Sequence, residues 1–261
     1  MDTFSFRRDP PEVMLKEDPL KRVLCQVRFS ANPELIDDDH EIKLASELRD
    51  QFPVRNSVQG VALQLFGTTP AVQRLRTFED IEGVWKVTVA PDFVAVETSR
   101  YKNRDGFLAQ LSGVLAALGS VSAPALVTRV GIRYTDQIEM SPELADWVNP
   151  ALLGCFGHVD AHNVEIQNQV ITALLRNRRS GSAVQVRSLI LPGGAQIDAG
   201  VEPEAFESWV LDLDSAVEGR EIFDVARLEG TARDLAHDAY RVFYWAVTDE
   251  FRKAFRGGGT S

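Results

Sequence analysis

Short apolar segments bounded by turn-forming residues recur along the chain and predict β-strands. The alternation of apolar and polar residues is clearest in Trp85–Val89, which predicts a strand with one buried face and one face in water. Turn-forming residues at Gly67–Pro70, Glu82–Gly83 and Ala90–Asp92 separate neighbouring segments, so we expect an antiparallel meander. The predicted strands are Val23–Phe29, Val58–Phe66, Val72–Phe78, Val84–Val89, Phe93–Thr98, Ala125–Glu139, Val164–Leu175, Ala183–Leu191 and Ser208–Asp214.

Four other segments place apolar residues three and four positions apart, which predicts amphipathic helices. The pattern is strongest over Asn103–Leu118, where Gly119 follows as a typical C-terminal cap. Near the C-terminus the same spacing continues without a break and predicts one long helix. The predicted helices are Asp38–Phe52, Asn103–Leu118, a short Pro142–Leu153 and the long Phe223–Phe255.

The order of these elements predicts an α+β protein in which antiparallel sheets are covered by three main helices. We expect one compact unit over residues 1–261, and internal halves at 20–120 and 121–256 stay open as an alternative because no sequence repeat decides between them. Residues 1–19 are polar with three prolines and predict an N-terminal arm, and residues 257–261 predict a flexible tail.

The charge balance bears on the class of partner. The chain has 261 residues, with 28 Lys and Arg against 38 Asp and Glu, which gives a formal net charge of −10. Phosphate backbones and anionic lipids attract clustered positive charge, which this balance does not favour. We therefore expect neither a nucleic-acid partner nor a membrane partner.

The N-terminal residues and the two cysteines bear on the compartment. The first residues contain no apolar stretch of the signal-peptide type, and no window of about 18 apolar residues occurs, so we expect a cytoplasmic protein. Cys25 and Cys155 stand in apolar segments without a CxxC pair. We expect two buried free thiols, and a disulfide between them stays open as an alternative.

Common catalytic signatures are missing from the sequence. It contains no P-loop, no GxGxxG before a helix, no GxSxG elbow, no HExxH and no zinc-deaminase motif. Four histidines leave little room for histidine-centred chemistry, although carboxylates alone can perform acid–base catalysis. The sequence therefore favours a non-enzymatic protein and leaves an enzyme open.

Charged residues in otherwise apolar strands form the main candidate site. Arg129 and Arg133 share one strand face around Gly131, which we expect to leave open space, and Asp212 and Asp214 share another. Arginines in apolar strands need carboxylate partners or a bound anion. We favour an internal network that fixes strand register; a pocket for a small anionic ligand and a catalytic carboxylate pair are the alternatives. The candidate ligand-binding residues are Arg28, Arg129, Arg133, Asp212 and Asp214, with Arg187 on a further strand.

A second candidate is a metal motif in a predicted loop. His158, Asp160 and His162 are two residues apart, so an extended chain would place their side chains on one face. Imidazole and carboxylate groups suit zinc, iron or manganese. The motif stands alone, and a fourth ligand would have to come from elsewhere. We therefore predict no cofactor, with a divalent metal at this motif as the alternative.

Three further segments have simpler interpretations. The basic turn Arg176–Arg179 is the densest positive patch and is expected to be a solvated turn. The acidic run Asp37–Glu41 is explained by the preference of a helix N-terminus for acids. On the C-terminal helix, Phe243, Val247 and Phe251 form a second apolar stripe, which we predict to bind another chain.

Several segments recur together in a known family. They are EDPLKRVLCQVRF at 17–29, RVGIRYTDQIE at 129–139, WVLDLDS at 209–215 and the closing aromatic helix. In this order they resemble a sporadically distributed, uncharacterised prokaryotic protein family, and the resemblance covers almost the whole chain. It implies a fold family and a scattered distribution typical of accessory or conflict-related genes, but no activity. The His158–His162 motif is not part of this pattern.

These observations lead to one functional expectation with two alternatives. We expect a non-catalytic binding or assembly module that uses its sheet face and its terminal helix, with a second copy of the chain or another protein as partner. The first alternative is an enzyme or sensor for a small anionic ligand, such as a nucleotide or a phosphorylated metabolite. The second is an accessory component of a prokaryotic defence system.

Overall fold

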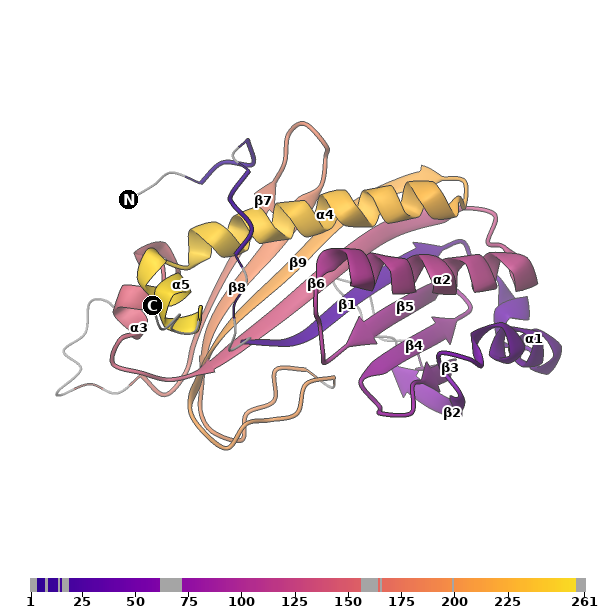
Figure 1. The fold of residues 1–261 in the computed structure, drawn as a ribbon, viewed down its shortest axis with the longest axis horizontal. Coiled ribbons are helices and arrows are strands. Elements are labelled where there is room, and N and C mark those ends of the chain that lie inside the picture. Colours follow the sequence, from indigo (N-terminus) through magenta and orange to yellow (C-terminus); the bar gives the residue numbers. More distant parts are fainter. Residues whose placement is uncertain are drawn as a thin grey trace, which may run out of the picture. The chain divides into compact units, whose positions relative to one another are not determined.

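The computed structural model describes residues 4–7, 9–13, 15, 19–61, 72–155, 164, 166–198 and 200–256. These residues form a nine-stranded antiparallel sheet and five α-helices, so the α+β class is confirmed (Figure 1). The strands are hydrogen-bonded in the order β2-β3-β4-β5-β1-β6-β9-β8-β7. This order makes β2 and β7 the two edge strands.

Each predicted strand overlaps a strand of the structure, although residues 62–66 of the second lie outside the described residues. The apolar segments bounded by turn-forming residues were therefore sufficient to predict the strands. The strands are β1 Leu20–Phe29, β2 Val54–Val61, β3 Val72–Glu79, β4 Trp85–Ala90, β5 Phe93–Thr98, β6 Val127–Glu139, β7 Gln169–Arg176, β8 Ala183–Leu191 and β9 Ser208–Glu221. The helices are α1 Asp38–Leu48, α2 Arg104–Ser122, α3 Leu144–Trp147, α4 Val225–Ala246 and α5 Asp249–Phe255.

The chain divides into two compact units, each assembled from separate stretches of sequence. Unit 1 comprises Met1–Arg22, Arg133–Ser215 and His237–Ser261, and unit 2 comprises Val23–Ile132 and Ala216–Ala236. In unit 2, helix α2 buries its apolar face, and Phe107 from that face stacks on Trp85 of β4 with ring centroids 5.7 Å apart. The pairing of β1 with β5 and of β3 with β4 continues the meander predicted from the sequence.

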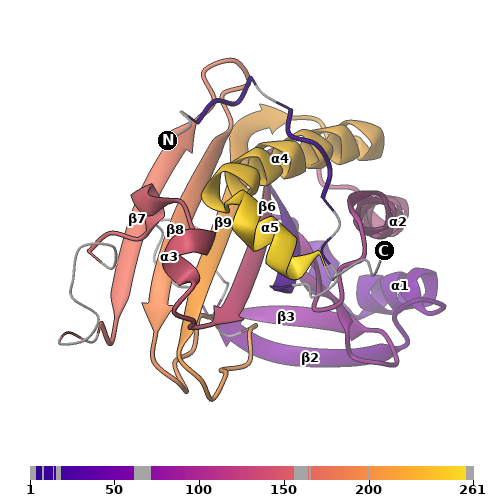
Figure 2. The same ribbon diagram turned by 60° about the vertical axis from the view of Figure 1, so that its left-hand side comes forward.

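The main core cluster of unit 1 lies on one face of its strands. Along β9, alternate residues Trp209, Leu211 and Leu213 are buried and share a core cluster with Val242 of α4 and Phe251 of α5. Figure 2 shows α3, α4 and α5 on this face. Alternate residues of β9 therefore point to the opposite face, where buried Val210 packs with Leu189 and Leu191 of β8, and we call this the second face.

The prediction of a single long C-terminal helix is wrong. Helix α4 ends at Ala246, and α5 begins at Asp249. Between them, Val247 forms a β-bridge with Val148, and Thr248 N donates to Trp147 O at 2.9 Å. Thr248 then caps α5 by accepting from Phe251 N. The apolar spacing continues through this break because Val247 and Phe251 are both core residues, so the spacing could not reveal it.

Candidate functional site

In unit 1, Arg133 on β6 and Asp212 on β9 form a buried ion pair. Arg133 Nε donates to Asp212 Oδ1 at 2.5 Å, and the two side chains are 8% and 2% exposed. Thr135 Oγ1 donates to the same oxygen at 3.1 Å, and Arg187 Nε on β8 donates to Asp212 Oδ2 at 2.7 Å. Asp212 is therefore hydrogen-bonded to both neighbouring strands and compensated by two guanidinium groups.

A second aspartate, Asp198, reaches the same arginine from the connection between β8 and β9. Asp198 Oδ2 lies 2.9 Å from Arg133 Nη1, and Oδ1 accepts from Arg22 Nη1 at 2.9 Å and from Gly200 N at 2.8 Å. A Cβ atom on Gly200 would lie 2.3 Å from the guanidinium carbon of Arg22, so glycine permits this close approach. We call the following alternating chain of charges the ion network: Arg22, Asp198, Arg133, Asp212 and Arg187.

The surrounding carboxylates keep Arg133 charged. Burial opposes its charge, but Asp212, Asp198 and Asp214 outweigh burial and raise the pKa of Arg133 above its ordinary value. Among the described residues, Arg133 Nη2 is buried without a hydrogen-bond partner. The ion network is therefore largely compensated from within, and this one donor is where an additional acceptor atom would be favourable.

The structure distributes the other predicted site residues differently. Asp214 is buried and acts on Arg133 through its charge. Arg28 lies in unit 2 and is bonded to Asp92 at 3.0 Å, with both side chains about a quarter exposed. The open space expected beside Gly131 is filled, because a Cβ atom there would lie 2.5 Å from Nη1 of Arg129.

Two members of the ion network were missed by the sequence analysis. Arg22 shares the even-numbered face of β1 with Arg28, so strand alternation could have identified it. Asp198 stands in a glycine-rich connection, where no periodic pattern indicates the direction of a side chain. Its partner is 176 positions away in the sequence, a pairing that depends on the tertiary fold.

The predicted metal motif His158, Asp160 and His162 lies outside the described residues. Within the described part of the chain, no group of three or more histidine, cysteine, aspartate or glutamate side chains is arranged to hold a metal ion. Cys25 is buried and Cys155 is exposed, and both are free thiols, so the expectation that both are buried is wrong for Cys155.

The apolar stripe on the C-terminal helices packs inside unit 1. Val247 and Phe251 are buried in the core cluster, and Phe243 is partly buried against it. The ring of Phe243 lies 6.2 Å from that of Phe251, and the ring of Phe255 lies 4.4 Å from it. These side chains therefore make their contacts within the unit, and the binding of another chain by Phe243, Val247 and Phe251 stays a prediction.

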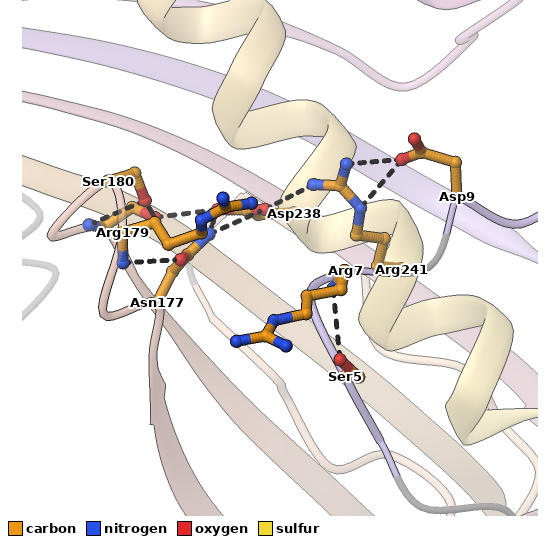
Figure 3. A network of polar contacts seen from close by, with 9 residues as sticks. Ser5, Arg7, Asp9, Asn177, Arg179, Ser180, Asp238 and Arg241 are labelled. Atoms are coloured by element: carbon orange, nitrogen blue, oxygen red, sulfur yellow. Dashed lines mark hydrogen bonds and ion pairs between the residues drawn. The ribbon is translucent and has the colours of Figure 1, made fainter.

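Hydrogen bonds to the buried carboxylate of Asp238 hold the basic turn after β7 against α4 (Figure 3). Asp238, 4% exposed, accepts hydrogen bonds from Asn177 Nδ2 at 3.2 Å and from Ser182 Oγ at 2.7 Å. Arg241 Nη1 also donates to Asp238 at 2.7 Å, and the same arginine pairs with Asp9 of the N-terminal segment. The turn is therefore fixed at one end of β7 rather than merely solvated.

Strand β7 exposes apolar side chains on the second face. Its residues alternate between half-buried and exposed, and Val170 and Leu174 are each 57% exposed. Seven large apolar side chains are exposed among the described residues, and three of them, Val164, Val170 and Leu174, lie in β7 or shortly before it. Since β8 is the one neighbour of β7 among the described strands, the outer edge of β7 can accept another strand.

A scan against protein-family models matches no family. A search of curated proteins also finds no match. No helix in the described part of the chain is long and apolar enough to cross a membrane.

An open cleft of about 410 Å³ lies in unit 1 at the end of β6. Trp147, Phe255 and Met140 supply apolar walls, and Glu139 is the one charged residue in its lining. Ser141, which also lines the cleft, donates to the carboxylate of Glu143, and this hydrogen bond lowers the pKa of Glu143 and so weakens it as a base.

Proposed function

We propose that this protein is a non-catalytic binding or assembly module whose working surface is the edge strand β7. The observation that carries the proposal is the exposure of Val170 and Leu174 on a strand at the edge of the sheet. Proteins usually protect such edges with charges, proline, a bulge or a covering segment, because exposed strands associate. A binding module that adds a strand to its sheet would need this edge to be accessible.

The distribution of charge supports the same proposal. The ion network directs its carboxylates and guanidinium groups toward one another, which is the arrangement expected of a network that fixes strand register. The exposed part of β7, by contrast, contains no charged side chain from Gln169 to Leu175. Binding through this surface would rest on backbone hydrogen bonds and apolar contacts rather than on ionic recognition.

A second candidate function is the sensing of a small anionic ligand. The observation in its favour is Arg133 Nη2, a buried donor without a hydrogen-bond partner among the described residues. An anion would have to compete with Asp198 for Arg133 and Arg22. Stabilisation of the wild-type chain by inorganic phosphate or a nucleotide in a thermal-shift assay, enhanced in Asp198→Asn, supports this candidate. Equal unfolding temperatures with and without these ligands in both proteins contradict it.

The test of the main proposal uses displayed peptides as long as β7. The peptides are selected for binding to the wild-type chain, immobilised at low density. Their affinities for the wild type and for Leu174→Lys are then measured. Ile81→Lys is the matched control, because Ile81 is 86% exposed in unit 2. Selected peptides are expected to bind the wild type and Ile81→Lys at least about tenfold more tightly than Leu174→Lys.

The main proposal is overturned if every binder found, whether a peptide or a second copy of the chain, binds Leu174→Lys as tightly as the wild type. The resemblance to an uncharacterised prokaryotic family remains part of the proposal and adds no activity to it.

A further inference from the structure

We propose that the strand that occupies the edge of β7 is β7 of a second copy of this chain, paired antiparallel about a two-fold axis through Thr172. The inference rests on the proposed function and names its partner. It is drawn from the order of side chains along β7, which is self-complementary in one register.

The edge formed by β7 lacks the features that keep strands apart. Its segment Gln169–Leu175 contains no lysine, proline or glycine and no charged residue, and eight residues pair with β8 without interruption. The opposite edge, β2, carries Arg55, Asn56 and Gly60, which are residues that disfavour strand addition. The two edges of the sheet therefore differ, and β7 is the one suited to association.

Symmetry limits the registers that a second copy can adopt. A two-fold axis perpendicular to the sheet pairs the strands antiparallel and keeps the second faces of both copies on the same side. Residues that oppose each other must then belong to the same face, so Val170, Thr172 and Leu174 oppose one another or even-numbered neighbours such as Asn168 and Arg176.

One register places each exposed apolar side chain of β7 opposite another apolar side chain. With Thr172 opposite Thr172 of the second copy, each Val170 lies opposite a Leu174. Arg176 then lies opposite Asn168, which is exposed just before the strand. Directly opposed apolar pairs and threonine pairs are favourable across antiparallel strands.

The neighbouring register is less favourable. If Ala173 opposed Ala173, Val170 would lie against Arg176, and Thr172 would lie against Leu174. The exposed apolar side chains would then remain partly in water beside a charge. We therefore assign the axis to Thr172 rather than to Ala173.

Cysteine cross-linking separates these registers. In the Thr172 register, residues 172 of the two copies have Cα atoms about 4.5–5.5 Å apart, which is within the range of a disulfide. We substitute Thr172→Cys in a Cys155→Ser background, because Cys155 is exposed and would cross-link by itself. Ala173→Cys in the same background is the matched control, since it reports the neighbouring register.

Mild air oxidation should convert most of the Thr172→Cys protein to a covalent dimer and leave Ala173→Cys as a single chain. Preferential cross-linking of Ala173→Cys overturns the assigned register, and cross-linking of neither variant overturns the pairing of two β7 strands. If neither variant cross-links but displayed peptides still bind through Leu174, this inference fails and the proposed function stands. If Thr172→Cys does not fold, the mass of Leu174→Lys in solution is compared with that of the wild type. Equal masses overturn the inference.

Discussion

Arg133 and Asp212 are 79 positions apart in the sequence, yet the guanidinium Nε of one lies 2.5 Å from the carboxylate Oδ1 of the other. The contact bridges β6 and β9, which are neighbours in the sheet. A shift of either strand by one residue would turn the two charges to opposite faces and break the contact between them. The pair therefore favours one register over its alternatives, at the expense of removing two charges from water.

The first prediction concerns the loss of this pair. Arg133→Met should lower the free energy of unfolding by about 3–5 kcal/mol, because Asp212 and Asp198 lose a compensating charge in a buried site. Urea unfolding followed by circular dichroism measures the change. The matched control is Arg28→Met, whose ion pair with Asp92 is partly exposed and should contribute less than about 1 kcal/mol. Equal losses in the two variants would contradict a register-fixing role for the ion network.

A second prediction follows from the position of Phe251. Its side chain, on α5, is fully buried against Phe243 of α4 and Trp147 of α3, so Phe251→Ala should cost about 3–5 kcal/mol of unfolding free energy through the cavity that it leaves. The mass of the chain in solution should change little as long as the variant is folded. A variant that retains its stability but loses self-association would instead support the helix stripe as the contact surface.

The sequence predicted the strands well and the C-terminal helix poorly, for related reasons. Strand signals are local, since Trp209, Leu211 and Leu213 alternate with residues that point away from the core. The break after Ala246 is not local, because it depends on the pairing of Val247 with Val148 far away in the chain. A periodic apolar pattern reports which side chains are buried and not whether the backbone between them stays helical.

The candidate site could be predicted only in part. Strand alternation put Arg129 and Arg133 on one face of their strand and Asp212 and Asp214 on one face of theirs, but it left open whether arginines and aspartates meet. It could not assign partners, so Asp92 as the partner of Arg28 and Asp198 as the partner of Arg22 were missed. Exposure along β7 was likewise hidden, because Val170 and Leu174 look like core residues in sequence.

A third prediction concerns the dependence of stability on pH. In unit 2, a hydrogen bond from Arg233 lowers the pKa of Asp105, and hydrogen bonds from Ser112 and then Arg233 lower the pKa of Glu229. Carboxyl groups with a lowered folded-state pKa stabilise the fold above their unfolded pKa values of about 4, and the contribution is lost as the pH falls through the folded values.

The variant that tests this dependence is Arg233→Met. The stability advantage of the wild type should be constant above about pH 5 and should shrink below about pH 4, as measured by urea unfolding across this range. Lys253→Met, which removes a mostly exposed cation 3.8 Å from Glu250, is the control and should show a smaller change with pH. An advantage that grows as the pH falls would contradict the assigned pairing.

The central claim is that β7 is an association edge, and the mass of the intact chain in solution tests it most directly. Native mass spectrometry and sedimentation equilibrium over a range of concentrations should give twice the 29.0 kDa chain mass for the wild type and for Ile81→Lys. Leu174→Lys should give the mass of one chain while it keeps the wild-type unfolding temperature. A single-chain mass for the wild type at every concentration, or a dimer that Leu174→Lys leaves intact, would contradict association of two copies through β7.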